Sequence, residues 1–324
     1  MTPTIDIFED RIPLPLLKIL LQDHTTHNNI YWATDNYGSL GPGYAFADAI
    51  LPELITGEHG RVIRPRVLKE KEIQRRRVKE KAEVFTPRRV CNLQNNLVEA
   101  AWFGREEVFN RTQTTPQGEH LIIPTEPGIT FPPGKVWTDY LQRTELEITC
   151  GEAPYLVSRY DAATGLFIPI PERIGLLDRK LRVVNENAQT PDEWHRAALT
   201  AYRHVYGYEW QGDSLLLARE NLLYTYIDYY TQRWQSEPPA AELRRIAEVI
   251  SWNLWQMDGF KMVLPMSCTN KTVTQYDLFG QASTTVEECP GCKQKNRLRL
   301  NGIYARIKDW STGKSVPFVS LLKS

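Results

Sequence analysis

The sequence predicts an α/β fold built on parallel strands. Two short apolar segments, residues 146–149 and 205–210, are bounded by turn residues, which is typical of buried strands. Each is followed by a stretch with helical periodicity, and alternating strands and helices favour a parallel sheet. In such a sheet a ligand lies across the carboxyl ends of the strands. Gly151, Glu209 and Asp258 follow predicted strands in the order that a nucleotide-type cofactor site requires.

Local signals predict the remaining elements. A helix begins at Pro87, with Thr86 as its N-cap, and runs towards Trp102. Another begins after Thr190, because Glu193 stands three residues later, as in a capping box. Helices are predicted at residues 14–21, 67–84, 175–183, 190–204, 213–230 and 243–255. A strand is predicted at 260–264, and hairpin strands at 304–309 and 316–321. Residues 111–135 and 272–296 are predicted as loops, and 28–44 as a loop or short strands.

Composition narrows the class of protein. The 324 residues suffice for one large domain or two small ones, and 42% apolar with 24% charged residues is ordinary for a globular chain. Lys plus Arg and Asp plus Glu both number 39, so affinity for DNA must come from local patches. The beginning of the chain lacks the order of a secretory signal, and no apolar run reaches the length of a membrane span. Five cysteines, an odd number, argue against a disulfide framework. We therefore expect a cytoplasmic protein without a membrane partner.

The residues at the strand ends suit a specific chemistry. The turn Cys150-Gly151-Glu152-Ala153 would bring backbone close to a ligand. Glu209 can accept hydrogen bonds from both hydroxyls of a ribose, and Asp258 can accept one from an adenine amino group. The alternative for Cys150-Gly151 is a tight turn without a ligand.

Four stretches resemble the amino-group, adenine-specific DNA methyltransferases. EVFTPRRVCNLQNN (83–96) is similar to their Phe-x-x-Pro type motif, and LEITCGEAPYL (146–156) to their motif I. VYGYEWQGDSLLLARENLL (205–223) is similar to motif II, and WNLWQMDGF (252–260) to motif III. The stretches KAEVFTPRRVCN, ITCGEAPYLVSRYD and RIGLLDRKLRVVNEN also resemble the modification subunits of restriction–modification systems. The resemblance covers most of the chain, roughly from Trp32 to Trp310.

The resemblance implies a class I S-adenosylmethionine-dependent methyltransferase sheet, Rossmann-like and partial. Residues 1–82 would form a helical N-terminal region, 83–265 the cofactor-binding core, and 266–324 a small appendage with a Cys-containing loop and a hairpin. The chain would bind S-adenosylmethionine for methylation of adenine N6 in DNA. Carried over by position, Phe85, Thr86 and Pro87 would line the methionine end, Glu147, Cys150 and Gly151 would form the motif I turn, Glu209 would hold the ribose, and Asp258 the adenine.

The sequence also departs from the family. Ala153 stands in place of the second motif I glycine, and the long distance from Gly151 to Glu209 implies an insertion at about 164–194. The catalytic motif, Asn or Asp followed by Pro-Pro and Tyr or Phe, is absent, and the nearest stretch, Phe131-Pro132-Pro133-Gly134, is predicted as a loop.

The catalytic residues of this chain are therefore unknown. We expect a second subunit to supply the catalytic motif and the target-recognition domain, and to cover the open edge of strand 146–149. The alternatives are that the sequence is a fragment of a longer chain, or that its own C-terminal hairpin covers that edge. A rival function is a non-catalytic, methyltransferase-like scaffold or sensor in a phage-defence system.

Two further sites are predicted from local patterns. Cys289-Pro-Gly-Cys292, with Cys268 upstream, has the spacing of half a zinc knuckle, although a fourth ligand is not evident. Free thiols in a loop are the alternative. The run Arg75-Arg76-Arg77, with lysines around it from Lys69 to Lys81, could contact DNA phosphates, or form the solvated face of a helix.

Overall fold

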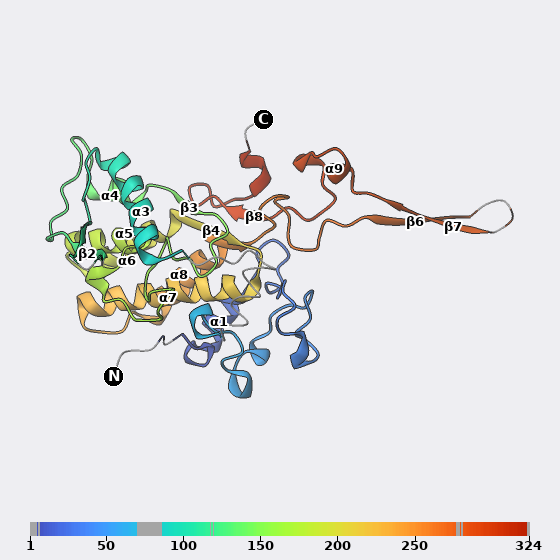
Figure 1. The fold of residues 1–324 in the computed structure, drawn as a ribbon, viewed down its shortest axis with the longest axis horizontal. Coiled ribbons are helices and arrows are strands. Elements are labelled where there is room, and N and C mark those ends of the chain that lie inside the picture. The colour runs from blue at the N-terminus through green and yellow to red at the C-terminus, as the bar shows by residue number, and fades with distance from the viewer. Residues whose placement is uncertain are drawn as a thin grey trace.

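The protein is described by a computed structural model that covers residues 5, 7–69, 86–116, 118, 120–276, 279 and 281–322. Its centre is a three-stranded parallel sheet in the order β3-β4-β5, surrounded by helices (Figure 1). The helices are α1 (Leu14–Leu21), α3 (Arg88–Phe103), α4 (Trp137–Leu141), α5 (Leu176–Asn187), α6 (Pro191–Arg203), α7 (Gly212–Trp234), α8 (Ala240–Asn253) and α9 (Pro290–Lys293). The strands are β1 (Asn110–Thr114), β2 (His120–Pro124), β3 (Glu145–Glu147), β4 (Val205–Glu209), β5 (Leu254–Gln256), β6 (Lys271–Tyr276), β7 (Ala282–Glu287), β8 (Arg306–Lys308) and β9 (Ser315–Pro317).

The register of the parallel sheet brings its strand ends together. Glu147 of β3 pairs with Gly207 of β4, and Glu209 of β4 pairs with Gln256 of β5. Helices α5, α6, α7 and α8 stand between these strands in the chain, so strands and helices alternate as the sequence predicts. The α/β class is confirmed at this level.

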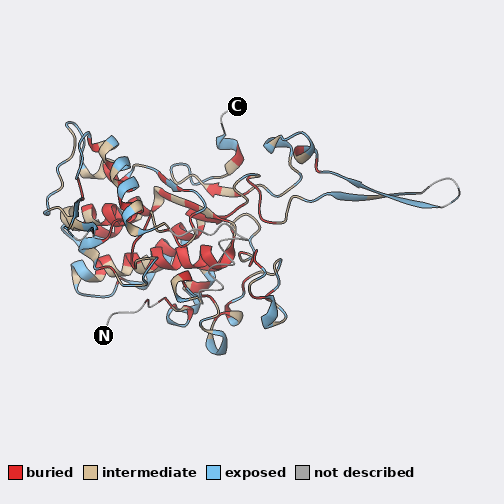
Figure 2. Ribbon diagram, in the orientation of Figure 1, coloured by how far each residue is buried: buried red, intermediate tan, exposed pale blue. Residues whose placement is uncertain are grey.

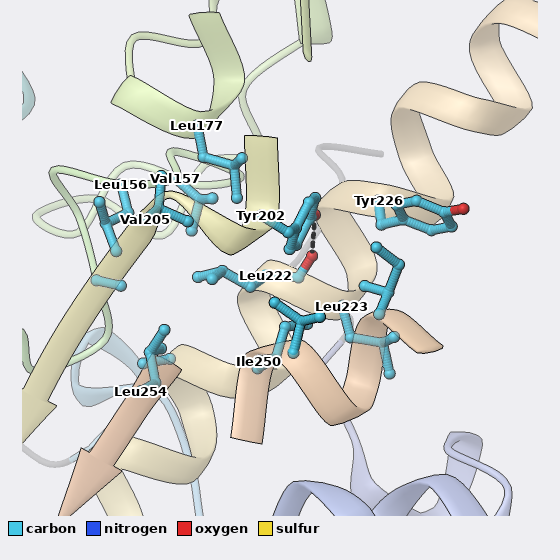
Figure 3. Close-up of a cluster of buried hydrophobic side chains, with 14 of the residues drawn as sticks. Leu156, Val157, Leu177, Tyr202, Val205, Leu222, Leu223, Tyr226, Ile250 and Leu254 are labelled. Atoms are coloured by element: carbon cyan, nitrogen blue, oxygen red, sulfur yellow. Dashed lines mark hydrogen bonds between the residues drawn. The ribbon is translucent and has the colours of Figure 1, made fainter. Parts of the chain in front are cut away.

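The central helix α7 supplies much of the hydrophobic core. Leu222 and Tyr226 of α7 lie in a buried cluster with Tyr202 of α6, Ile250 of α8 and Leu254 of β5 (Figure 3). The Tyr202 hydroxyl donates to the backbone oxygen of Leu222 over 2.7 Å, so the polar end of this ring is satisfied inside the core. Sheet and helices are therefore held together mainly by burial of apolar surface.

The N-terminal segment packs into the same core. Arg219 of α7 is fully buried, and its guanidinium donates to the backbone oxygens of Gln22 and Ser251 over 3.0 and 3.1 Å and of Leu254 over 2.6 Å. The side chain of Gln256 bonds to both backbone groups of Tyr31 over 2.8 Å. The predicted helix α1 is confirmed. The described residues from 22 to 69 are irregular backbone with short 3-10 turns, so the expectation of a helical N-terminal region is wrong for them. The helix predicted at 67–84 lies mostly outside the described residues, and Arg66–Leu68 form a 3-10 turn.

The insertion predicted at 164–194 is largely helical. It contains α5, and α6 begins within it with the expected cap, because Thr190 Oγ1 accepts from the backbone N–H of Glu193 over 3.2 Å. Arg179 of α5 donates to the side chains of Asn92 and Asn96 over 3.1 and 2.6 Å. The insertion therefore links helix α3 to the core.

Three sequence predictions of elements are wrong. Residues 111–135, expected as a loop, contain the β1–β2 hairpin, and 272–296 contain the β6–β7 hairpin. Strands β1 and β7 are largely exposed and rich in Thr, so they lack the apolar alternation that reveals a half-buried strand. Strand β2 (HLIIP) is a continuous apolar run bounded by Pro124, and it too lacks that alternation. Residues 260–264, expected as a strand, form a turn with an isolated bridge at Val263.

The third parallel strand lies earlier in the chain than predicted. Helix α8 ends at Asn253, whose side-chain amide donates to the backbone oxygens of Tyr202 and Val205, each over 3.0 Å. These two long-range bonds hold residue 253 against β4, so the chain continues as β5 instead of the expected helix. Asp258 consequently follows a strand, as the motif assignment requires.

The C-terminal appendage has two parts. The β8–β9 hairpin forms where the sequence predicts one, but β9 ends at Pro317, and Phe318–Leu321, expected as strand, form a 3-10 turn. The hairpin and this turn pack over β5 in a second apolar cluster, where the rings of Trp255 and Phe318 are 5.1 Å apart. The hairpin forms a sheet of its own, so the expectation that it might cover the edge of β3 is wrong for the described residues. The β6–β7 hairpin projects from the molecule as an exposed arm (Figures 1 and 2).

None of the helices in the described ranges combines the length and the apolar surface that a membrane crossing requires.

Candidate functional site

The three predicted cofactor segments meet at one edge of the sheet. The backbone N–H of Cys150, in the turn after β3, donates to the Tyr208 oxygen of β4 over 2.9 Å. The N–H of Met257, directly after β5, donates to the Glu209 oxygen over 3.0 Å. The motif I turn, the end of β4 and the segment after β5 are thus neighbours, as the sequence predicts.

The turn after β3 has an unusual backbone. Thr149, Gly151 and Ala153 have φ angles of 46°, 54° and 62°, in the left-handed region that favours glycine. A Cβ atom on Gly151 would meet nothing within 4 Å, so glycine serves the backbone conformation there and leaves open space beside it. Cys150 points inward against Gly207, where a Cβ atom would lie 3.2 Å from the Cys150 sulfur. The turn therefore presents bare backbone at the sheet edge.

Glu209 joins this turn to β4. Its carboxylate accepts from the backbone N–H groups of Gly151 (2.9 Å), Trp210 (2.9 Å) and Gln211 (3.2 Å). The residue is 8% exposed, and burial raises the pKa of its carboxyl, whereas the three backbone bonds lower it. A carboxylate has about four acceptor positions. Binding a ribose diol at Glu209 therefore requires at least one of the three N–H bonds to be exchanged.

Glu147 lies beneath the turn. Its two carboxylate oxygens accept from the N–H groups of Tyr155 (3.3 Å) and Leu156 (3.1 Å), and so order the segment that follows Ala153. Burial raises the pKa of Glu147 to about 8, and the charge of Glu209 adds to this effect. Much of this carboxyl is therefore protonated at neutral pH, and a cationic group in the site would favour its ionised form.

Asp258 is half-buried in a tight turn. Its Oδ1 atom accepts from the N–H groups of Phe260 (2.9 Å) and Lys261 (3.0 Å). Phe260 is 82% exposed next to this carboxylate, and its ring offers a flat apolar surface suited to stacking on a base. The sequence analysis did not single out Phe260. The signal that could have found it is an aromatic residue just after a strand-end acid.

The segment predicted to line the methionine end is described in part, since Phe85 lies outside the described residues. Helix α3 begins at Arg88 with Pro87 at the N-cap position and no side-chain cap, so the predicted role of Thr86 as N-cap is wrong. The backbone oxygen of Thr86 accepts instead from the Cys91 thiol at 3.6 Å. Burial raises the pKa of Cys91 to about 12, and the charge of Glu147 contributes, so the start of α3 lies near the β3 turn.

The sequence-predicted DNA contacts are not described. Arg75, Arg76 and Arg77 lie outside the described residues, and their role remains a prediction. Lys69, at the start of this basic run, is turned towards the core, where its ammonium lies 3.3 Å from the buried carboxylate of Asp213.

The predicted metal ligands come together. The sulfur atoms of Cys268, Cys289 and Cys292 all lie within 4.8 Å of one another, and those of Cys268 and Cys292 are 3.6 Å apart. Cys289 is buried, and the other two are half-buried.

The stretch Phe131-Pro132-Pro133-Gly134 is a loop, as predicted, and Phe131 packs on Phe103 with ring centres 5.9 Å apart.

Comparison of this chain with protein-family models, with curated proteins and with solved structures finds no match. The function must therefore be argued from the geometry of the site.

Proposed function

We propose that this chain binds S-adenosylmethionine at the carboxyl ends of β3, β4 and β5, and serves adenine-N6 methylation of DNA together with a second subunit. The observation that carries the proposal is the 2.9 Å hydrogen bond from the N–H of Gly151 to the carboxylate of Glu209. It joins a bare backbone turn and a buried acid at the carboxyl ends of β3 and β4, and nucleotide cofactors bind at the carboxyl ends of parallel strands. Asp258 and the exposed ring of Phe260 directly follow the next strand, β5, and would contact the adenine.

In the proposed reaction, this chain binds the cofactor and aligns its methyl group. Methyl transfer gains most of its rate from placing nucleophile, methyl carbon and sulfur in line, without a covalent intermediate. Glu209 would accept from the ribose hydroxyls and Asp258 from the adenine amino group. Glu147, protonated when the site is empty, could ionise when the ammonium of the cofactor's methionine part binds.

The need for a second subunit is supported by the unpaired side of strand β3. In the described part of the chain, β3 pairs with β4 and with no strand on its other side. The strand order β3-β4-β5 runs in one direction, so a switch point at β3 requires another strand on the free edge. Leu146 and Ile148 at this edge are 46% and 64% exposed. A bare apolar edge tends to pair with another chain.

Helix α3 presents a second exposed apolar surface. Leu93 and Leu97, one turn apart, are 60% and 62% exposed, while Asn95 and Glu99 on the opposite side are buried. A helix normally directs its apolar stripe inward, so this outward stripe favours a partner. We propose that the second subunit covers β3 and α3 and contributes the catalytic motif and the target-recognition domain.

The non-catalytic scaffold is the second candidate. It is favoured by Glu209, whose three internal hydrogen bonds already use most of its acceptor capacity. In that case the turn and the acid stabilise each other, and the site stays closed to a cofactor.

Calorimetric titration with S-adenosylmethionine and transfer of a tritiated methyl group to unmodified DNA separate these possibilities. The chain should be tested alone and co-expressed with the product of its neighbouring gene. We expect binding in the assembled complex and methyl transfer only there. Robust transfer by the single chain would contradict the need for a partner. Binding to neither form would favour the scaffold.

The interface is tested by replacing Leu93 and Leu97 with Ser. Because both side chains are exposed, the free energy of unfolding should change little, whereas co-purification of the partner should be lost. Leu298→Ser is the matched control, since Leu298 is also 62% exposed but lies in the appendage. If the wild type, the variant with both Leu93 and Leu97 replaced by Ser, and Leu298→Ser retain the partner equally, α3 is not the contact surface.

A further inference from the structure

The segment from 266 to 301 folds almost without a hydrophobic core. Of its described residues, only Cys289 and Gly291 are buried. Its largest element is the β6–β7 hairpin, whose strand β7 is exposed along its whole length. A lone two-stranded hairpin is marginally stable in water. Small structures without a core are usually stabilised by a metal ion or a disulfide.

Polar contacts converge at the base of this arm. The N–H of Cys289 donates to the side chain of Asn270 over 3.3 Å, and Asn301 donates to the Thr269 oxygen over 2.7 Å. The N–H of Asn301 also points at the Cys289 sulfur, at 3.3 Å. Three separate stretches of chain therefore meet around the cysteine sulfurs.

The turn that carries two of the cysteines is tightly constrained. A Cβ atom on Gly291, between Cys289 and Cys292, would lie 2.5 Å from the backbone nitrogen of Leu300. Only glycine allows residues 299–300 to approach this turn so closely. The turn is thus built to direct both thiols to one side, where Cys268 meets them.

We propose that Cys268, Cys289 and Cys292 bind one Zn²⁺ ion, which fastens the two ends of the β6–β7 arm to each other. Sulfur ligands around a tetrahedral Zn²⁺ lie about 3.8 Å apart, given Zn–S bonds of about 2.3 Å. The observed separations of 3.6 Å for Cys268–Cys292 and at most 4.8 Å across the group need only a small closure.

Two properties of the zinc site remain to be explained: the net charge of the Zn²⁺–thiolate group and the fourth zinc ligand. Three thiolates around a divalent ion leave a negative charge in excess, and the basic residues Lys293, Lys295 and Arg297 follow directly in the chain. In the part of the chain that the structure describes, no fourth Cys, His, Asp or Glu joins the group. Cys268 and Cys292 are half-buried, so the group lies at the protein surface and a water molecule is the expected fourth ligand. This inference is independent of S-adenosylmethionine binding.

The test begins with elemental analysis of the full chain, purified without chelator. We expect about one zinc per chain, and a large loss in each of the variants Cys268→Ser, Cys289→Ser and Cys292→Ser. Cys91→Ser is the control, because Cys91 is a buried thiol on α3 and should leave the zinc content unchanged.

Thiol mapping on the wild-type chain keeps the proposal testable if the variants fail to fold. Alkylation followed by peptide mass spectrometry should be slow at Cys268 and Cys292, and chelator should accelerate it there but not at Cys91. Reloading with Co²⁺ should produce thiolate-to-metal charge-transfer absorption. Absence of zinc with rapid alkylation of the group before chelator would establish free thiols and overturn the proposal. A Cys268–Cys292 disulfide would overturn it as well.

Discussion

The α7 core and the C-terminal arm reach ordered structure by different routes. Helix α7 is buried along most of its 23 residues (Figure 2). Even its charged Arg219 is hydrogen-bonded inside the protein. The segment from 266 to 301 buries only Cys289 and Gly291 among its described residues. The core is stabilised by removal of apolar surface from water, whereas the arm depends on backbone pairing and on its cysteine cluster. Perturbations of the two regions should therefore have different effects.

The largest expected effect is on the core. Leu222→Ala removes a fully buried side chain from the cluster of Figure 3 and should lower the free energy of unfolding by about 2–5 kcal/mol. Val286→Ala, in the arm, should change it by less than about 0.5 kcal/mol, because Val286 is 67% exposed. Urea denaturation of both variants measures the difference. Similar losses in the two would mean that the arm contributes to the same core.

Buried acids should make the core sensitive to pH. Burial raises the pKa of Glu9 from 4.5 to about 7, and the charge of Glu9 raises the pKa of fully buried Glu220 further. Between about pH 4.5 and 7 the unfolded chain has released the proton that folded Glu9 still holds. The free energy of unfolding should therefore fall as pH rises through this window.

Glu9→Gln tests this interpretation, since glutamine keeps the neutral form at every pH. It should remove this part of the pH dependence and stabilise the protein above pH 7 by on the order of 3 kcal/mol. Glu237→Gln, at an exposed residue, is the control and should follow the wild type. Urea denaturation at several pH values is the measurement. Parallel curves for wild type and Glu9→Gln would show that Glu9 does not carry the effect.

Substitution of Glu209, at the carboxyl end of β4, should weaken the affinity for S-adenosylmethionine. Glu209→Ala should weaken S-adenosylmethionine binding by about 1.5–3 kcal/mol, roughly tenfold to a hundredfold, because the ribose loses hydrogen bonds to a charged group. Glu287→Ala, on the exposed arm, should bind as the wild type does. Calorimetric titration gives both affinities. An unchanged affinity in Glu209→Ala would remove Glu209 from the site.

The smallest expected effect is at a helix terminus. Thr190→Ala removes the side-chain acceptor for the N–H of Glu193 and should cost about 1 kcal/mol. Thr284→Ala, on exposed strand β7, should cost less, since it caps no helix. A comparison of melting temperatures measures both. A larger loss at Thr284 would show that the arm supports the fold more than its exposure indicates.

Local patterns in the sequence were sufficient for the elements that fold on their own signals. Helices α1 and α7 and strand β4 lie close to where periodicity predicted them, and Thr190 caps α6 as its spacing indicated. The acid at the end of β4 was found for the same reason, since a strand followed by a helix identifies the residue between them.

Only the tertiary structure decided the features that depend on residues far apart in the chain. Strand β5 begins at Leu254 because Asn253 bonds to Tyr202 and Val205, about 50 residues earlier, and no local pattern contains that contact. The same holds for the hydrogen bond between Gly151 and Glu209, 58 residues apart, which makes two separate motifs into one candidate site. The exposed arm was missed because polar strands that bury no face leave no periodicity to detect, and their pairing comes from backbone hydrogen bonds.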